Sequence, residues 1–513
     1  MQELHTPSQA AQWLRQHVTG TLQADSRELT PGDGFIAWPG AAVDARRFVA
    51  DALIRGAGAC LVEHEGLAAL GLEDARVASF SGLKAATGAI AAEFFGSPSS
   101  QLAVVAITGT NGKTSTAWWL AQALSTLQGD DARPCGLIGT LGVGRPPASD
   151  QPLGAQQGRN AITSTGLTTP DPVLLQRTLR QFADDGLKAC AMEASSIGVE
   201  EHRLDGTRFQ VAVFTNLTQD HLDYHGSMEA YWLAKRRLFS WPGLACAVVN
   251  VDDAQGPVLV DALAGTSVDV WTVSCQRTAR LLARNIAYEG PGLRFEVVEA
   301  GVAHVLQTRM IGAYNVANLL GVLATMRGMG VPLEAAVQAC CSLHPVPGRM
   351  ECLGRAGEPL VAVDYAHTPD ALSHALAALR PLAAQRGGRL WCVFGCGGDR
   401  DASKRPLMGA IACQKADQVV VTSDNPRSEK AESIIAHILL GLAHSKAVDV
   451  QTNRALAIAD TVARAAANDV ILVAGKGHEQ TQEIAGVKHV FSDREHAQQA
   501  LRSRRLHMTE VRT

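Results

Sequence analysis

A glycine-rich turn at residues 108–114 constrains the fold of this chain more than any other feature. The segment TGTNGKT lies between LAVVAIT, a pattern typical of a buried strand, and KTSTAWWLAQALSTL, a pattern typical of a helix. Such a turn lets backbone N–H groups point at phosphate oxygens, and the helix N-terminus adds partial positive charge. The sequence therefore predicts an α/β unit that binds a nucleoside triphosphate. The residues predicted to contact the triphosphate in this turn are Gly109, Thr110, Asn111, Gly112, Lys113, Thr114 and Ser115.

Two side chains in the turn have specific predicted roles. Lys113 can reach the terminal phosphates, and the hydroxyl of Thr114 can ligate Mg²⁺. The phosphate loop of kinases and GTPases has glycine where this chain has Ile107, so a kinase fits less well than a shortened variant of that loop. A glycine turn with an incidental lysine is disfavoured by the strand before it and the helix after it.

The length of 513 residues exceeds what one hydrophobic core supports, and turn-rich segments divide the chain. We predict three domains, at residues 1–99, 100–346 and 347–513. The first alternates short apolar and alanine-rich helical segments. The last contains four strand patterns, each followed by a helical one, as in an open parallel sheet of the dinucleotide-binding type. The predicted class is α/β throughout, with an antiparallel region covering VDVWTVS and LRFEVV and an exposed loop at residues 144–161.

Composition and charge limit the possible partners. A net charge of −4 and 46% hydrophobic residues are typical of a folded enzyme and give no basic field for nucleic acid or anionic lipid. The eleven cysteines lack zinc-site or thioredoxin spacing, so reduced thiols are expected. The N-terminus has no signal-peptide pattern and no apolar run approaches about 20 residues, which predicts a cytoplasmic protein.

The turn TGTNGKTST resembles the ATP loop of the Mur ligases and of the related folylpolyglutamate synthetases. Five further segments follow in the order of that family: EASS at 193–196, NLTQDHLD at 216–223, YNVAN at 314–318, PGRME at 347–351 and DYAHTP at 364–369. The resemblance implies an ATP-dependent amide ligase with a small UDP-binding domain, a central ATPase domain and a Rossmann-like C-terminal domain. It also implies that Asn315, Arg349, Asp364 and His367 shape the nucleotide pocket.

Three more residues are candidates for holding Mg²⁺. Glu193 and His221 follow strand patterns, and α/β enzymes place their sites at the carboxyl ends of strands. By resemblance both are ligands of two Mg²⁺ ions, although His221 could instead cap a helix. Lys235 falls on the apolar face of a helix that Ser227 would cap. Its ammonium either extends to water or, as the resemblance implies, is carbamylated and becomes a ligand and catalytic group with Lys113.

Specificity is expected to reside in the two outer domains. Arginine pairs bidentately with carboxylates, and the DNPR segment at 424–427 is similar to the motif with which some Mur ligases recognise meso-diaminopimelate. An Asn-Pro turn alone would explain Pro426 but not Arg427. By this resemblance the diaminopimelate contacts are Arg400, Asp424, Asn425, Arg427, Gly475 and Glu479.

The contacts to UDP-MurNAc-L-Ala-D-Glu follow from the same resemblance. They are Ser26, Thr168, Thr169, Ser195 and Arg203. The chain departs from the family pattern at four neighbouring positions, which removes or alters polar partners: Ala45, Leu167, Ile197 and Glu201.

The resemblance thus implies a monomeric ligase that adds meso-diaminopimelate to UDP-MurNAc-L-Ala-D-Glu through an acyl phosphate, in peptidoglycan precursor synthesis. A lysine-adding or folylpolyglutamate-forming ligase is the nearest alternative, and Arg427 argues against both. A non-catalytic nucleotide switch is a further alternative, but it would not need Glu193, His221 and Lys235 together.

Overall fold

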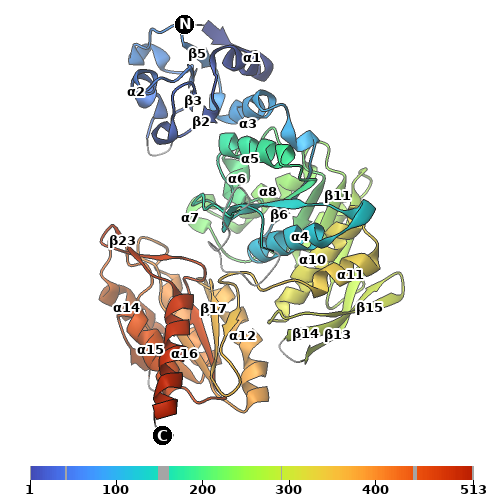
Figure 1. Cartoon of the computed structure of the whole chain (residues 1–513), viewed down its shortest axis with the longest axis vertical. Helices are drawn as coiled ribbons and strands as arrows, with labels where there is room; N and C mark the ends of the chain where they lie inside the picture. Colours follow the sequence, from blue (N-terminus) through green and yellow to red (C-terminus); the bar gives the residue numbers. More distant parts are fainter. Residues whose placement is uncertain (1, 41–42, 148–160, 290–291, 443–447, 511–513) are drawn as a thin grey trace.

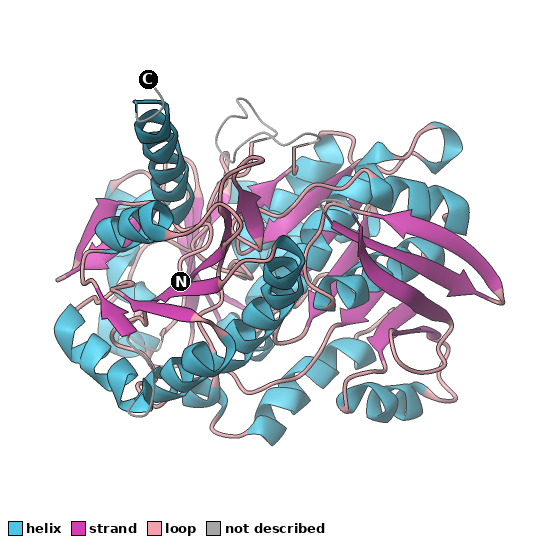
Figure 2. Cartoon of the chain, turned by 90° about the horizontal axis from the view of Figure 1, so that it is seen from below, coloured by secondary structure: helices cyan, strands magenta, loops and turns pink. Residues whose placement is uncertain are grey.

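The structure is a computed structural model that describes residues 2–40, 43–147, 161–289, 292–442 and 448–510. Three large sheets occupy three successive stretches of the chain, stacked from the N-terminus at one end to the C-terminus at the other (Figure 1). Seen from below, the strands are flanked by helices on both sides (Figure 2). The fold is therefore α/β, as predicted.

The first sheet is parallel throughout. Its strand order is β1 (Gln2–Leu4), β5 (Val77–Phe80), β4 (Ala59–Glu63), β3 (Gly34–Ala37) and β2 (Leu22–Gln23). Alternate strand residues face opposite ways, so Ile36 packs under α1 (Pro7–His17) and α3 (Leu83–Phe94), while Phe35 packs under α2 (Val49–Ile54).

The middle sheet combines a parallel region with an antiparallel extension. Its order is β15 (Val302–Gln307), β14 (Gly292–Glu299), β13 (Leu281–Glu289), β12 (Asp269–Ser274), β11 (Cys246–Asn250), β10 (Val211–Phe214), β6 (Ala103–Thr108), β9 (Ala189–Glu193), β7 (Cys135–Gly139) and β8 (Gly142–Gly144). From β13 to β7 in this order, each strand is parallel to the next, whereas β14 and β8 pair antiparallel with the two ends of this run and β15 pairs antiparallel with β14.

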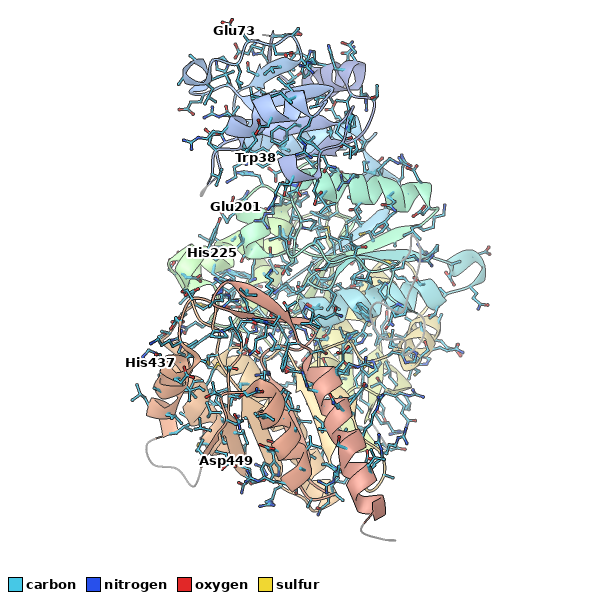
Figure 3. All side chains as sticks on the ribbon, turned by 60° about the vertical axis from the view of Figure 1, so that its left-hand side comes forward. Trp38, Glu73, Glu201, His225, His437 and Asp449 are labelled. Atoms are coloured by element: carbon cyan, nitrogen blue, oxygen red, sulfur yellow. The ribbon has the colours of Figure 1, made fainter. Side chains whose placement is uncertain are left out.

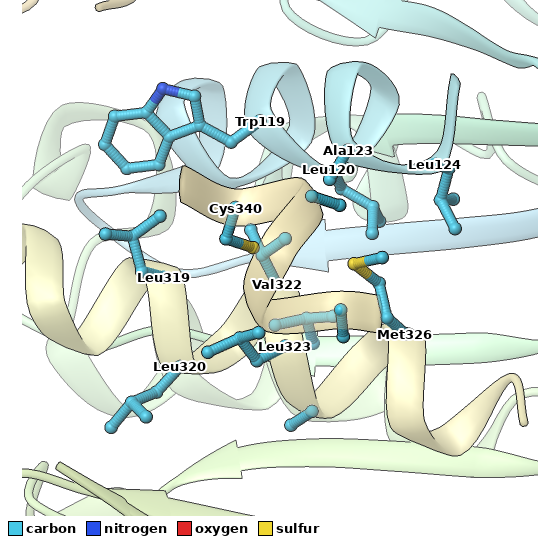
Figure 4. Packing of buried hydrophobic residues seen from close by; sticks show 14 of the residues in the cluster. Trp119, Leu120, Ala123, Leu124, Leu319, Leu320, Val322, Leu323, Met326 and Cys340 are labelled. Atoms are coloured by element: carbon cyan, nitrogen blue, oxygen red, sulfur yellow. The ribbon is translucent and has the colours of Figure 1, made fainter. Parts of the chain in front are cut away.

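Helices cover both faces of the middle sheet. One face carries α4 (Lys113–Thr126), α10 (Tyr314–Gly328) and α11 (Leu333–Cys341). Side chains of α10, among them Leu319, Val322 and Met326, lie in one buried cluster with Trp119, Leu120 and Leu124 of α4 (Figure 4). The other face carries α5 (Pro172–Asp184), α8 (Met228–Arg236) and α9 (Gln255–Leu263). The short helices α6 (Ser196–Glu200) and α7 (Leu222–His225) lie in the loops between strands.

The third sheet has the order β16 (Glu351–Leu353), β17 (Leu360–Asp364), β21 (Val470–Ala474), β18 (Leu390–Phe394), β19 (Gln418–Val421) and β20 (Val448–Val450). All of its pairs are parallel except β16 with β17. One face packs on α12 (Pro369–Arg386), α13 (Lys404–Lys415) and α14 (Ala431–Leu439), the other on α15 (Arg454–Arg464) and α16 (Asp493–Glu510). A hairpin, β22 (Thr481–Ile484) and β23 (Val487–Val490), follows β21.

One strand prediction was wrong. The segment VDVWTVS, expected in the antiparallel region, is β12, which runs parallel to both β11 and β13. Burial alternates along β12 as it would in a half-covered antiparallel strand: Trp271 and Val273 are buried, whereas Val270 and Thr272 are only partly covered. Most of the predicted loop at 144–161 lies outside the described residues.

Two further expectations can be compared with the structure. All eleven cysteines are free thiols, which confirms that prediction. Among the described helices, none combines the length and the apolar character that a bilayer crossing would require.

Candidate active site

The carboxyl ends of three parallel strands meet at one edge of the middle sheet. The glycine-rich turn leaves β6, Glu193 ends β9, and residues 215–221 leave β10. In the register, Ile107 is opposite Glu193 and Thr108 is opposite Phe214. The structure therefore brings the predicted phosphate turn, Glu193 and the segment leading to His221 together.

The two glycines of the turn have backbone conformations that would strain any other residue. Gly109 has φ +147°, and a Cβ there would lie 1.9 Å from Thr215 Oγ1. Gly112 has φ +86°, and a Cβ there would lie 2.3 Å from Asn318 Oδ1. The turn is thus wedged between the loop after β10 and helix α10.

Hydrogen bonds with the loop after β10 fix the conformation of the turn. The Asn111 backbone N–H donates to Asn216 Oδ1 at 2.9 Å, and the Thr218 N–H donates to Thr110 Oγ1 at 2.9 Å. In each bond a backbone N–H donates to a side-chain oxygen, so the Asn111 N–H is already engaged. The helix-terminal N–H groups that follow in the chain are the natural site for an anion.

Two lysines converge on one backbone oxygen. Lys113 Nζ donates to the carbonyl oxygens of Gly109 and Thr110, at 2.8 Å each. Lys235 Nζ donates to the same Gly109 oxygen at 2.9 Å and lies 4.2 Å from the ring centre of Tyr231. Burial lowers the pKa of both ammonium groups, and the charge of Lys113 lowers the pKa of Lys235 further. An uncharged, nucleophilic amine is therefore more accessible at Lys235 than at an exposed lysine.

Lys235 lies where the helical pattern placed it. Helix α8 begins after Ser227, whose side chain accepts the N–H of Ala230, and Tyr231 and Lys235 are both buried on one face. The interpretation in which the ammonium extends to water is wrong, because only 1% of Lys235 is exposed.

Glu193 lies among hydroxyl groups. Its Oε2 accepts from Thr114 Oγ1 at 3.0 Å and from Thr140 Oγ1 at 3.2 Å, and its Oε1 accepts the Thr140 N–H at 2.8 Å. Carboxylate and hydroxyl oxygens are hard donors of the kind that Mg²⁺ takes. Thr140 was not predicted, although it directly follows β7 at the same edge of the sheet.

His221 has left-handed backbone geometry, with φ +53°, at the start of α7. Its ring lies 6.1 Å from that of Tyr231, which places it beside the helix that carries Lys235. It occupies the N-cap position without a capping hydrogen bond from its side chain, so helix capping does not explain it. Burial lowers its pKa and favours the neutral imidazole, the form that binds metals.

The side chains near the turn can contribute only part of a metal ion's ligands. Among the described residues, no group of three or more His, Cys, Asp or Glu side chains lies together as a self-sufficient metal site. Mg²⁺ keeps several waters and readily takes phosphate oxygens, so Thr114 and Glu193 together are an adequate protein contribution. The residues present therefore fit a magnesium–nucleotide complex better than a free metal ion.

Arg349 links the third stretch of the chain to the turn. Its Nη2 donates to Thr114 Oγ1 at 3.4 Å, and its guanidinium lies 4.5 Å from the ring centre of Tyr365. The Tyr365 ring also contacts those of His367 and His478, at 4.7 and 5.2 Å. Arg349 therefore lies beside Thr114 of the phosphate turn, and His367 lies against the same tyrosine.

The other two residues predicted to shape the nucleotide pocket, Asp364 and Asn315, form hydrogen bonds with the backbone. Both carboxylate oxygens of Asp364 accept backbone N–H groups, from Met350 at 2.7 Å and from Ala366 at 2.8 Å. Asn315 donates to the Ile311 carbonyl at 2.7 Å at the start of α10. Asp364 and Asn315 thus hold the backbone after β17 and before α10, respectively.

The predicted diaminopimelate contacts gather at the carboxyl edge of the third sheet. Asn425 Nδ2 donates to Glu479 Oε2 at 2.8 Å. Arg427 has φ +54°, and its Nη1 donates to the Gly398 carbonyl at 2.6 Å. Arg400 lies near them on an exposed loop, with Nη1 donating to the Asp399 carbonyl at 3.3 Å.

Asp424 and Gly475 lie beneath that group. Gly475 has φ +121°, and a Cβ there would lie 2.4 Å from Asp424 Oδ2. Asp424 is buried and its Oδ1 accepts the Asn425 N–H at 2.6 Å. The close contact explains the need for glycine and brings the loops after β19 and β21 together.

Four of the five predicted sugar–peptide contacts form one network. Thr169 Oγ1 donates to the Glu193 carbonyl at 2.8 Å and lies 3.0 Å from Ser195 Oγ, while Arg203 Nη1 donates to the Thr169 carbonyl at 3.0 Å. Thr168 Oγ1 lies 3.0 Å from Thr140 Oγ1, which bonds Glu193. Ser26 lies in the first stretch, where its carbonyl accepts from Arg55.

Three of the four departures from the family pattern, Leu167, Ile197 and Glu201, lie within two residues of this network along the chain, whereas Ala45 lies in the first stretch. Glu201 forms a 2.6 Å ion pair with Lys84 of α3 and accepts a hydrogen bond from Tyr224, so it joins the first and middle stretches. Figure 3 labels it between the first sheet and His225. The other three differ in environment: Ala45 opens a short 3₁₀ helix, Ile197 lies in α6 and Leu167 is 43% exposed.

Comparison with known proteins agrees with this geometry. The model of the Mur ligase middle domain matches residues 107–326, and that of the Mur ligase glutamate ligase domain matches residues 348–477. The UDP-N-acetylmuramoyl-L-alanyl-D-glutamate–2,6-diaminopimelate ligase of Acidovorax sp. (strain JS42) is 60% identical over 98% of this chain and 99% of its own.

Two solved structures extend the comparison. A ligase of that name is 34% identical, with a TM-score of 0.65, over 94% of this chain and 95% of its own. The MurF ligase of Thermotoga maritima in complex with ADP is 18% identical and shares the fold, with a TM-score of 0.64 over 96% and 98%. With both family models and a full-length relative at this identity, the chain belongs to the Mur ligase family of ATP-dependent ligases.

Proposed function

We propose that this chain joins meso-diaminopimelate to the D-glutamate carboxylate of UDP-MurNAc-L-Ala-D-Glu in an ATP-dependent reaction of peptidoglycan precursor synthesis. The observation that carries the proposal is the group of Arg427, Asn425 and Glu479. A guanidinium and an amide suit a carboxylate, and a glutamate suits an ammonium group. This set matches an amino acid with two carboxylates and two amines better than it matches lysine.

The three stretches of chain divide the substrates between them. Residues 1–99 bind the UDP group with Ser26, residues 100–346 bind ATP and the peptide end, and residues 347–513 bind the amino acid. Thr168, Thr169, Ser195 and Arg203 hold the sugar–peptide near Glu193. Support comes from the network that joins those four residues to Thr140 and Glu193.

Magnesium and the nucleotide meet at the turn. Thr114 and Glu193 would hold one Mg²⁺, and His221 and Lys235, the latter as a carbamate, would hold a second. When bound, the metal neutralises charge on the phosphates and the substrate carboxylate. Carbamylation requires an uncharged amine, and the lowered pKa of Lys235 supports it.

The protein's own groups account for the remaining steps. Lys113 leaves the carbonyl oxygens of its turn and pairs with the γ-phosphate, which the substrate carboxylate attacks to give an acyl phosphate and ADP. Glu479 and Arg427 hold one amino-acid end of diaminopimelate. The uncharged amine at its other end attacks the acyl carbon, and phosphate leaves from the tetrahedral intermediate as the amine nitrogen gives up a proton. Arg349, opposite Thr114, helps to exclude water from the acyl phosphate.

The net charge of −4 supports small-molecule partners, with neither nucleic acid nor membrane among them, and we propose a cytoplasmic monomer.

A parallel assay tests the function. The chain is mixed with UDP-MurNAc-L-Ala-D-Glu, ATP and Mg²⁺, with either meso-diaminopimelate or L-lysine, and phosphate release and product mass are measured. Phosphate release and the tripeptide mass with diaminopimelate alone are expected. Turnover with lysine would refute the specificity, and no turnover with either would refute the proposed reaction.

A further inference from the structure

Lys476 is a fully buried lysine whose ammonium touches two proposed diaminopimelate contacts. Its side chain is 0% exposed, and its Nζ donates to Asn425 Oδ1 at 2.9 Å and to Glu479 Oε2 at 2.8 Å. A buried lysine is costly unless it is paired and hydrogen-bonded. Neither the phosphate turn nor the metal donors use this lysine.

The network around Lys476 fixes which way the Asn425 amide points. Asn425 Oδ1 accepts from Lys476 Nζ and also from the Glu483 backbone N–H, at 3.0 Å. Its Nδ2 donates to Glu479 Oε2 at 2.8 Å. Because two donors hold the carbonyl end, a flipped amide would place N–H groups against N–H groups. Asn425 can therefore present only an N–H donor to a ligand.

The same ammonium fixes the orientation of Glu479. Its Oε2 accepts from both Lys476 and Asn425, while no hydrogen bond from the described part of the chain reaches Oε1. A carboxylate held at one oxygen keeps the other as an acceptor. The proposed amino-acid site thus has a donor at Asn425 and an acceptor at Glu479.

We infer that Lys476 is a positioning residue that sets this donor–acceptor order and so selects an incoming amino acid in its zwitterionic form. The inference rests on the proposed function. The Asn425 N–H faces the ligand carboxylate and the Glu479 oxygen faces its ammonium, and Lys476 contacts neither ligand group itself.

The test compares K476M, E479Q and the double variant K476M/E479Q with the unmodified chain. K430M is the matched control, because it makes the same change at an exposed lysine of the same stretch. We expect K476M to raise KM for meso-diaminopimelate by about tenfold or more, with KM for ATP within about twofold. The double variant should be no worse than the worse single variant, because both changes act on one network.

Three results would overturn the inference. They are an unchanged KM for diaminopimelate in K476M, effects of the two single changes that multiply in the double variant, and a parallel loss of ATP and diaminopimelate binding. If K476M alone does not fold, the double variant carries the test, because it leaves no unpaired carboxylate. Failure of both to fold would make Lys476 a determinant of the fold and also count against the inference. Absence of turnover by the unmodified chain would instead refute the proposed function.

Discussion

Arg454 and Asp493 form a buried ion pair beneath the proposed amino-acid pocket. Arg454 Nε and Nη2 donate to the two Asp493 oxygens at 2.7 Å each, and both side chains are 0% exposed. Nη1 also donates to the Ser423 carbonyl at 3.1 Å and Nη2 to the Ala474 carbonyl at 2.9 Å. These carbonyls lead into the two pocket loops, so the guanidinium ties helices α15 and α16 to both.

The substitution R454M should be strongly destabilising. It leaves the Asp493 carboxylate buried without its partner, and breaking a buried pair in this way costs about 3–5 kcal/mol. For a domain of this size each kcal/mol lowers the unfolding temperature by roughly 2–4 °C, so the expected fall is on the order of 10 °C. The released loops should also weaken diaminopimelate binding.

The same helix offers a matched control. Arg464 pairs with Asp449 at 2.6 Å, but their side chains are 53% and 42% exposed, and such a surface pair contributes only about 0–1 kcal/mol. Thermal unfolding is followed by circular dichroism for R454M, R464M and R454M/D493L. The double variant should recover much of the loss, because no charge remains buried alone. A fall in R454M no larger than in R464M would refute the reasoning, as would a double variant less stable than R454M.

Three further outcomes are expected. G109A should abolish ADP binding in calorimetry, because its Cβ would lie 1.9 Å from Thr215 Oγ1; measurable affinity would contradict the rigid turn. R427M should raise KM for diaminopimelate roughly 10- to 100-fold, the value of a charged hydrogen bond, in the phosphate-release assay, and an unchanged KM would contradict its role. Burial lowers the pKa of His478 from 6.5 to about 3, so below about pH 6.5 the unfolded chain binds a proton that the folded chain does not. The free energy of unfolding should therefore decrease as the pH is lowered below about 6.5, and it should decrease less steeply in H478Q. An equal dependence of unfolding temperature on pH in the two proteins would contradict this.

The parts of the fold that the sequence predicts are those with local causes. The strand, turn and helix around residues 103–126 depend on neighbours in the chain, and helical spacing alone places Lys235 on the buried face of α8. Strand direction is a different matter. The side chains of β12 alternate because the helices cover one of its faces better than the other, and that covering depends on segments distant in the sequence.

The residues missed at the site are those whose role depends on distant partners. Thr140 is 53 residues from Glu193, and Lys476 is 51 residues from Asn425. A threonine after a strand and a lysine in a glycine-rich loop are common, so neither draws attention until the sheet brings the partners together. Their position in the sequence could have indicated a role at the site, because both residues follow parallel strands at the carboxyl edge of a sheet.

The Gly109 carbonyl couples the two lysines of the phosphate site. Both ammonium groups donate to this oxygen, and the charge of Lys113 lowers the pKa of Lys235. A phosphate anion forms stronger, charge-assisted bonds than a backbone carbonyl does, so a bound nucleotide draws Lys113 away from the oxygen. Conversely, a Lys235 that has lost its charge no longer opposes the positive charge of Lys113. The chemical state of Lys235 and the position of Lys113 are therefore linked through one atom, and neither can change without altering the energy of the other.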